Sequence, residues 1–257
     1  MIAAVCSVVP SCSVKEERAG CPTWLQLTVN DCRQYSKDLS IQLLQNDIRV
    51  LDERIAVDDY PEYYEREITK GYYKLVAHAG IRRCRVEGIR MMIPEGEDAD
   101  SLFAYNNSLA CQDEFTRDSV KLQKKYATVF LEIKIQGGGY CPYDYTVRSS
   151  VSGTDMSDFS PVHGRFIKDL VLDGENKTRF TLPRQDDNHP EDLYIQAVHK
   201  DTKLTHLISL GSCISETGYS WNSRNLEDIY LTIDYIDYKF EIKVADWEVG
   251  NQFDMIF

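Results

Sequence analysis

The stretch GGGYCPYDY, residues Gly137–Tyr145, is the densest group of side chains in this chain that could do chemistry. The glycine backbone could cradle a phosphate, the thiol could take part in redox chemistry, and the tyrosine rings could pack against another molecule. A phosphate loop also needs a following Lys-Ser/Thr pair or a GxGxxG pattern, and neither is present. We interpret the stretch as an aromatic contact loop, in which the glycines allow the turn that presents Tyr140, Tyr143 and Tyr145.

Tyrosine is the feature that stands above background, with 16 residues that mostly occur in groups. A phenol combines a large apolar ring with a hydrogen-bonding hydroxyl, which suits protein–protein contacts. We therefore predict assembly contacts at Tyr60, Tyr63, Tyr64, Tyr72, Tyr73, Tyr140, Tyr143 and Tyr145. A further group, Tyr230, Tyr235 and Tyr238, fits ordinary half-buried strand tyrosines equally well.

The cysteines and histidines do not form a recognisable catalytic or metal-binding motif. The eight cysteines include no CxxC pair, the five histidines no HExxH, and the chain has no GxSxG. We expect no metal, no cofactor and no enzymatic activity, with a distributed hydrolase site, for example Cys213 with a distant histidine, as the open alternative. Scattered single cysteines are typical of small buried apolar residues, and the alternative for the N-terminal cysteines Cys6, Cys12, Cys21 and Cys32 is a set of disulfides within or between molecules.

Net charge and hydropathy limit the kinds of partner that the chain can bind. A net charge of −12 disfavours a nucleic-acid groove, and no apolar run approaches the roughly 20 residues that cross a membrane. The opening residues lack a basic start and contain Pro10, so we expect no secretion signal. Arg82, Arg83, Arg85 and Arg90 form the one basic cluster, which predicts a solvated or ion-paired face, or alternatively an anion contact.

Alternation of apolar and polar residues predicts a mainly β fold. Strands are expected at Trp24–Val29, Gly88–Ile93, Thr128–Ile135 and Leu193–Val198. In Ile229–Val244 the apolar parity switches near Tyr235, which predicts one long strand with a β-bulge. With no repeat or linker, residues 1–257 are expected to form a single domain, with 1–22 as a cysteine-containing N-terminal arm.

Turn and capping signals predict the connections. Leu39–Val57 is interpreted as a hairpin around Asn46-Asp47, although a helical stripe also fits, and Lys168–Leu182 as a hairpin around Asp173-Gly174. Short helices are expected at 58–71, because of Pro61 and the acidic first turn, and at about 113–126.

The runs GRFIKDLVLDGENKTRFTLP (Gly164–Pro183) and LYIQAVHK (Leu193–Lys200) together resemble a succession of strands in cypovirus polyhedrins. DDYPEYYEREITKGYY and IRMMIPEG, further upstream, are similar to segments of the same family. The resemblance implies a compact jelly-roll-like antiparallel β-sandwich with a few peripheral helices and no enzymatic activity. It also implies homotrimers in a crystal lattice that embeds virus particles as occlusion bodies in the cytoplasm of an infected host cell, with nucleotides at lattice sites in some members.

The functional hypothesis is therefore a structural matrix protein of viral occlusion bodies that dissolve in alkali. Ionisation of all sixteen phenols, whose ordinary pKa is about 10, would take the charge from −12 to −28, so that contacts made at neutral pH would repel. The alternative is a secreted or host-directed β-sandwich binding protein, in which the tyrosines form a binding patch and the cysteines pair internally.

Overall fold

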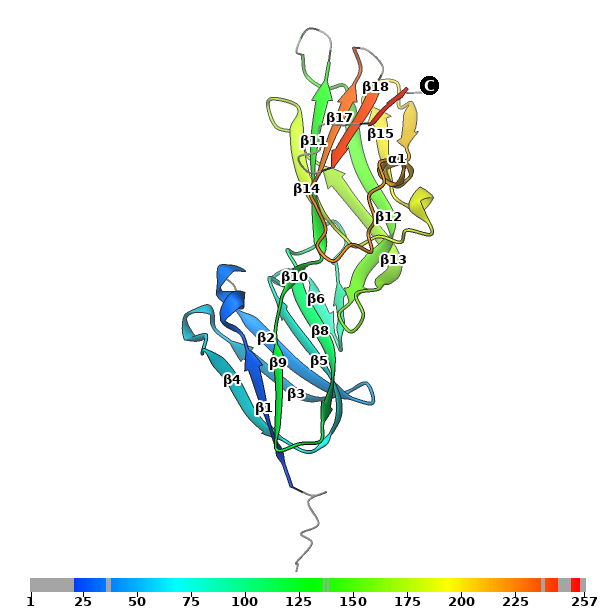
Figure 1. Ribbon diagram of the computed structural model, residues 1–257. Coiled ribbons are helices and arrows are strands. Elements are labelled where there is room, and N and C mark those ends of the chain that lie inside the picture. Colours follow the sequence, from blue (N-terminus) through cyan, green and yellow to red (C-terminus); the bar gives the residue numbers. More distant parts are fainter. Residues whose placement is uncertain are drawn as a thin grey trace, which may run out of the picture.

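The computed structural model describes residues 21–35, 38–135, 137, 139–236, 239–244 and 251–254. Two β-lobes lie end to end along the chain, the N-terminal one in blue to green and the C-terminal one in green to red (Figure 1). Most strand pairs are antiparallel, and β1–β9 and β11–β17 are the parallel pairs in the part of the chain described. The predicted mainly β, sandwich-type fold with antiparallel sheets is thus confirmed.

The N-terminal lobe packs a three-stranded sheet on a five-stranded one. Leu25 and Leu27 alternate along β1 with the exposed Trp24 and the half-buried Gln26, and they are fully buried in one apolar cluster with Ile41 and Leu75 of the larger sheet. The three-stranded sheet has the order β4 (Tyr63–Ile68), β1 (Thr23–Thr28), β9 (Phe115–Ser119). The five-stranded sheet has the order β10 (Gln123–Lys124), β8 (Phe103–Cys111), β5 (Gly71–Ala79), β2 (Leu39–Gln45), β3 (Ile48–Ile55).

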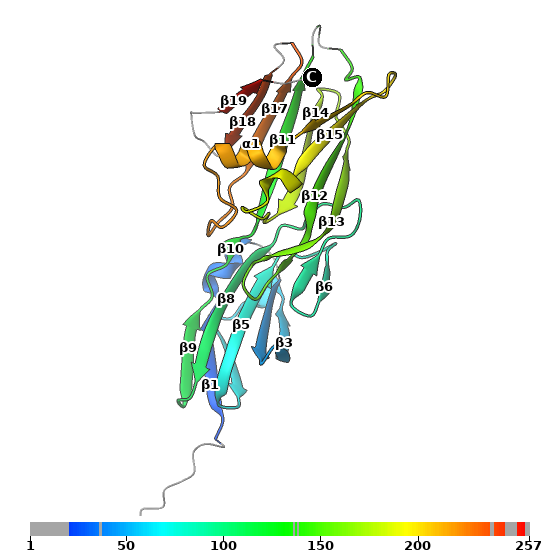
Figure 2. The ribbon, with the colours of Figure 1, turned by 90° about the vertical axis from the view of Figure 1, so that its right-hand side faces the viewer.

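The C-terminal lobe is a second sandwich, seen edge-on in Figure 2. One sheet is β14 (Lys177–Pro183), β11 (Tyr126–Lys134), β17 (Ile229–Asp234), β18 (Lys239–Val244) and β19 (Asn251–Asp254). The other is β16 (Thr205–Ile208), β15 (Tyr194–His199), β12 (Tyr143–Asp155), β7 (Arg90–Met92) and β6 (Arg85–Glu87), with β13 (Pro161–Leu170) also paired to β12. The remaining described elements are α1 (Leu210–Glu216) and the 3-10 helices η2 (Asn30–Tyr35), η3 (Val57–Asp59) and η5 (Pro190–Asp192).

The two lobes share apolar packing. Leu44, Val76 and Ala104, on the N-terminal five-stranded sheet, belong to the same buried cluster as Met91 and Met156 of the C-terminal lobe. A contiguous core usually marks one folding unit. This shared core supports the single-domain prediction, which we keep as a proposal; residues 1–20 of the predicted N-terminal arm lie outside the described residues.

The hairpin at Leu39–Val57 is confirmed. Strands β2 and β3 pair antiparallel, and Asn46 and Asp47 both adopt positive φ, of 51° and 61°. Asn and Asp tolerate this left-handed region better than other non-glycine residues, which is why the pair signals the turn.

The prediction of a single bent strand over Ile229–Val244 is wrong. The segment forms two antiparallel strands, with Ile229 opposite Val244 and Ile233 opposite Phe240. The switch in apolar parity marks a chain reversal between β17 and β18, because an antiparallel return restarts the inward and outward alternation.

Both predicted helices are also wrong. Residues 58–71 form the short η3 and the strand β4, which pairs with β1 and buries Tyr64, while 113–126 holds β9 and β10. Strands β4 and β9 both pair with β1, and β10 pairs with β8. This tertiary pairing outweighs the local helix signals. Among the described residues no helix has the length and apolar character needed to cross a membrane.

The Asp173-Gly174 turn exists, but the predicted hairpin does not. Asp173 accepts hydrogen bonds from the Glu175 and Lys177 backbone N–H groups, at 2.9 and 2.8 Å. The flanking strands then part, because β13 pairs with β12 and β14 pairs with β11. The turn therefore joins the two sheets of the sandwich.

Candidate binding cleft between the lobes

A cleft of about 640 Å³ lies where the N-terminal lobe meets the sheet edge of the C-terminal lobe. One wall comes from the segments that leave β5 and enter β8, and the other from the ends of β11 and β14. Its lining consists of Gly80, Arg82, Arg83, Asp98, Ala99, Asp100, Ser101, Tyr126, Thr128, Arg179, Phe180 and Thr181.

Asp100 holds the arginine-bearing wall in place. Its carboxylate oxygen Oδ2 accepts the backbone N–H groups of Arg82, Arg83 and Cys84, at 2.6, 2.7 and 2.7 Å. The side chain is buried, and three charge-assisted hydrogen bonds stabilise a carboxylate there. The turn that carries Arg82 and Arg83 is therefore built around a negative charge that is already satisfied.

The cleft has unpaired positive charge. Arg83 pairs with Glu97 at 3.1 Å, whereas Arg82 and Arg179 have no ion pair within the described part of the chain. The acidic Asp98 is itself neutralised by Lys168, at 3.4 Å, and accepts the Thr181 N–H at 3.3 Å. The two free guanidiniums therefore set the electrostatic character of the opening.

The opposite wall offers an aromatic ring and hydroxyl groups. Tyr126 packs edge-on against Phe103, with ring centroids 5.5 Å apart, and the Lys124 ammonium lies 4.8 Å from its ring centre. Burial raises the pKa of the Tyr126 phenol, so that it stays a neutral hydrogen-bonding group. Thr128 and Thr181 add hydroxyls to this wall, and Ser101 on the facing wall hydrogen-bonds the Tyr126 phenol, so the cleft can donate hydrogen bonds to a polyhydroxylated ligand and accept them from it.

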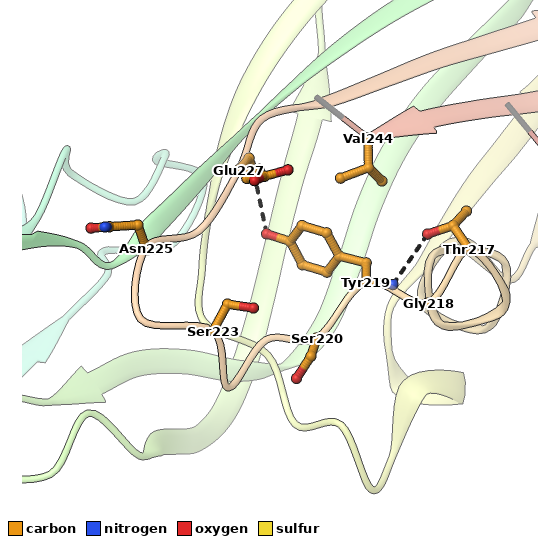
Figure 3. A pocket seen from close by; sticks show the side chains of 8 residues that line it. All are labelled: Thr217, Gly218, Tyr219, Ser220, Ser223, Asn225, Glu227 and Val244. Carbon is orange, nitrogen blue, oxygen red and sulfur yellow. Dashed lines mark hydrogen bonds between the residues drawn. The ribbon is translucent and has the colours of Figure 1, made fainter. Parts of the chain in front are cut away.

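A second, smaller pocket of about 200 Å³ lies beside the end of α1 (Figure 3). It is lined by Thr217, Gly218, Tyr219, Ser220, Ser223, Asn225, Glu227 and Val244. The Tyr219 hydroxyl points to the Glu227 backbone carbonyl and donates to it at 3.2 Å. This pocket has about a third of the volume of the cleft between the lobes, which makes it the weaker candidate.

Among the described residues no group of three or more His, Cys, Asp or Glu side chains could hold a metal ion. Neither the cleft nor the smaller pocket contains a histidine or cysteine in its lining. What the cleft can do chemically is bind through hydrogen bonds, ring contact and positive charge.

The predicted contact tyrosines divide by exposure. Tyr60, Tyr64, Tyr73 and Tyr145 are buried in the cores, and Tyr143 is half-buried and stacks on Tyr235 with centroids 4.8 Å apart. The exposed ones are Tyr63, Tyr72 and Tyr140. They lie on different strands and loops, and none lines the cleft between the lobes. A contact role for these residues stays a prediction.

The hypothesis that alkali breaks contacts by ionising the tyrosines does not hold for the buried phenols. Burial raises the pKa of Tyr60 to about 12, and burial, with the neighbouring Glu53 carboxylate, raises that of Tyr64 further. The pKa of Tyr145 also rises through burial, and its hydroxyl donates to the Tyr235 hydroxyl at 3.0 Å. These groups stabilise the chain's own cores and stay neutral at the pH where an exposed phenol ionises.

The described cysteines are free thiols: Cys21, Cys32, Cys84, Cys111, Cys141 and Cys213. Cys32 is fully buried, and burial, with a smaller effect from Asp31, raises the pKa of its thiol to about 12. Cys32 is therefore not available for the predicted intermolecular disulfide. Cys21 is exposed, and Cys6 and Cys12 lie outside the described residues.

We expect iodoacetamide at pH 8 to alkylate Cys21 at least about a hundredfold faster than Cys32 in the native protein, because the thiolate is the reactive form and burial suppresses it. Both cysteines lie on the tryptic peptide 19–33, so tandem mass spectrometry of this peptide over time, which assigns the label to each position, measures both rates. In 8 M urea the two residues should react at similar rates. Fast native labelling of Cys32 would contradict its burial.

Sequence reasoning found part of this cleft. Arg82 and Arg83 belong to the predicted basic cluster, whose alternative reading was an anion contact, while Arg90 pairs with Asp155 at 3.4 Å as the ion-paired reading predicts. Tyr126 and Arg179 were missed. The available signal was the strand alternation, which places Tyr126 and Thr128 on the outward side of β11.

The chain matches no protein-family model and no curated protein. Solved structures with a similar fold include a candidate polysaccharide-binding protein from Bacteroides thetaiotaomicron, with a TM-score of 0.63, 11% identity, and coverage of 91% of this chain and 98% of that one. A candidate adhesin from Bacteroides ovatus has a TM-score of 0.62 and 11% identity, and covers 94% and 97%. The fimbrial anchor protein Mfa2 from Porphyromonas gingivalis has a TM-score of 0.58 and 14% identity, and covers 88% and 98%. At these identities the likeness shows a shared fold.

The resemblance to cypovirus polyhedrins is wrong, because the structures that share this fold along most of the chain are bacterial adhesin-like and fimbrial proteins. The predictions drawn from the resemblance are wrong as well. They are the matrix function in viral occlusion bodies, the lattice of homotrimers with virus particles and nucleotides, and the location in the cytoplasm of an infected cell. The quoted runs are short strand and turn patterns, which do not by themselves specify one β-fold.

Proposed function

We propose that this chain is a non-enzymatic, adhesin-type binding protein that holds a glycan in the cleft between its lobes. The cleft is the observation that carries the proposal: about 640 Å³ of space lined by hydroxyls, guanidiniums and one tyrosine ring. Ligand sites are typically concave, with a few convergent polar groups, and often lie where two structural units meet. The fold that it shares with adhesin-type and polysaccharide-binding structures supports the same reading.

The lining suits a sugar better than an apolar ligand. A sugar presents hydroxyls at its edge and C–H groups on its faces, so its site needs hydrogen-bonding side chains together with an aromatic surface. Thr128, Thr181 and Ser101 supply hydroxyls, and Tyr126 supplies the ring. An adhesin-type role would bring the protein to a cell surface, where glycans are among the ligands within reach.

The proposal is tested by filling the cleft. Thr128 lies on the outward side of β11, and a tryptophan there occupies the cleft while its β-propensity suits the strand. We expect Thr128→Trp to lose at least about tenfold in affinity for every glycan that the native protein binds on a printed array of neutral and acidic oligosaccharides, followed by calorimetry.

Thr205→Trp is the matched control, since Thr205 is an exposed strand threonine on β16 and outside the cleft. Glu227→Gln reports on the smaller pocket. Equal binding by Thr128→Trp and the native protein would place the glycan site elsewhere, and an array without any bound glycan would overturn the proposed function.

A further inference from the structure

The outward face of the C-terminal sheet carries an aromatic pair directly next to the cleft. Phe130 on β11 lies opposite Tyr230 on β17, and their rings stack with centroids 5.0 Å apart and planes 11° from parallel. The residues on either side of Phe130, Val129 and Leu131, are buried in the core. The pair is therefore on the solvent side, and Tyr230 is 46% exposed.

Arg179 joins this pair to the cleft. It lies on β14 directly opposite Phe130, so that Arg179, Phe130 and Tyr230 form one row across three neighbouring strands. With strands about 4.8 Å apart, the row spans about 10 Å between the outer two backbones. Arg179 also lines the cleft, as does Thr128 of the neighbouring row. The cleft and the aromatic row are therefore one continuous surface.

The charges along this surface leave two cations unpaired. On the row's far side Lys243 pairs with Glu241 at 3.1 Å, and beside Phe130 the Glu132 carboxylate pairs with Lys177 at 3.7 Å. Arg179 has no such partner among the residues that the structure describes, and neither has Arg82 across the cleft. In a chain of net charge −12, free guanidiniums on both walls of one cleft point to an anionic ligand.

We infer that the ligand is an acidic glycan, whose carboxylate or sulfate groups bind Arg82 and Arg179 while a neighbouring sugar ring packs on the Phe130–Tyr230 pair. This inference rests on the proposed function and names its ligand class. Guanidinium matches carboxylate and sulfate oxygens in a two-pronged geometry, which makes it the suitable cation for this contact. The stacked rings supply the apolar surface that the C–H face of a sugar requires.

The test compares hexagalacturonate with its fully methyl-esterified, uncharged form, by calorimetry at 50 and 200 mM NaCl. We expect the acid to bind at least about tenfold more tightly at low salt, with a smaller gap at 200 mM because salt screens the charges. A heparin hexasaccharide, in the same assay, tells whether sulfate serves in place of carboxylate.

Two variants separate the charged contact from the ring contact. Arg179→Gln should weaken binding of the acid by about tenfold to a hundredfold and leave the ester nearly unchanged, because a charge-assisted bond is lost. Tyr230→Ser should weaken acid and ester by the same factor, about tenfold, because the ring contact does not depend on ligand charge.

The controls change the same side chains elsewhere on the surface. Arg165→Gln removes an exposed arginine of β13, and Tyr72→Ser removes an exposed tyrosine of β5, so both should bind like the native protein. Equal affinity for acid and ester, with both lost in Thr128→Trp, overturns the inference and leaves the proposed function standing. Acid binding that is indifferent to both Arg179→Gln and Tyr230→Ser overturns the assigned site, and no glycan binding at all overturns both proposals.

Discussion

Replacing Gly80 by alanine should destabilise the protein by roughly 2–5 kcal/mol, the largest effect that we expect from a single methyl group. Gly80 follows β5 with φ of +94°, a left-handed conformation that costs an L-residue about 1–2 kcal/mol. A Cβ there would also lie 2.0 Å from the Ser101 carbonyl oxygen. That oxygen is backbone and cannot rotate away, so the chain must shift at a further cost of about 1–3 kcal/mol.

The matched control is Gly88→Ala. Gly88 also has positive φ, +64°, but its Cβ would meet nothing within 4 Å, so the conformational cost alone remains, about 1 kcal/mol. Urea unfolding midpoints of the two variants separate the two contributions. If both variants lose the same stability, close approach to Ser101 is not what requires glycine at position 80. Since Gly80 and Ser101 both line the cleft, Gly80→Ala should also weaken glycan binding.

Acidification from pH 7 to pH 4 should cost about 3 kcal/mol of stability at His78 alone. This side chain is 6% exposed, and burial, with a smaller effect from Arg54 and an opposing one from Asp52, lowers its pKa to about 4. An unfolded histidine has a pKa near 6.5, so between these values the unfolded chain binds the extra proton. Stability is therefore fully present above pH 6.5 and is lost as the pH falls towards 4.

The measurement is urea unfolding at pH 7.0, 5.5 and 4.5 for the native protein and His78→Gln, whose side chain stays neutral. Carboxylates such as Glu53, whose pKa the Arg66 guanidinium lowers through a hydrogen bond, add their own loss in acid, but equally in both proteins. The difference between the two curves isolates His78. His189→Gln, at an exposed position, should follow the native curve. Parallel curves for His78→Gln and the native protein would show that His78 is not buried as a neutral group.

Local structure could be predicted from the sequence wherever a few neighbouring residues determine it. Asn46 and Asp47 turn the chain because their side chains tolerate positive φ, and Leu131 and Ile133 face inward because a strand alternates. The same reasoning failed for the segment after Pro61. Local capping signals favour a helix there, but Tyr63–Ile68 pairs with β1 and forms a strand. A sequence pattern that spans a few residues carries no information about a strand partner that lies about forty residues away in the chain.

The mainly β character, the turns at Asn46-Asp47 and Asp173-Gly174, and the basic cluster that contains Arg82 and Arg83 could all be predicted from the amino-acid sequence. The three-dimensional arrangement was needed to see that the turn at Asp173 joins the two sheets, that Tyr145 is a core residue, and that Arg179 and Arg82 lie on opposite walls of a cleft. The physical reason is range: backbone sterics and side-chain alternation act between neighbours in the chain. Strand pairing and burial join residues such as Phe130, Arg179 and Tyr230, whose meeting depends on which sheet each strand enters.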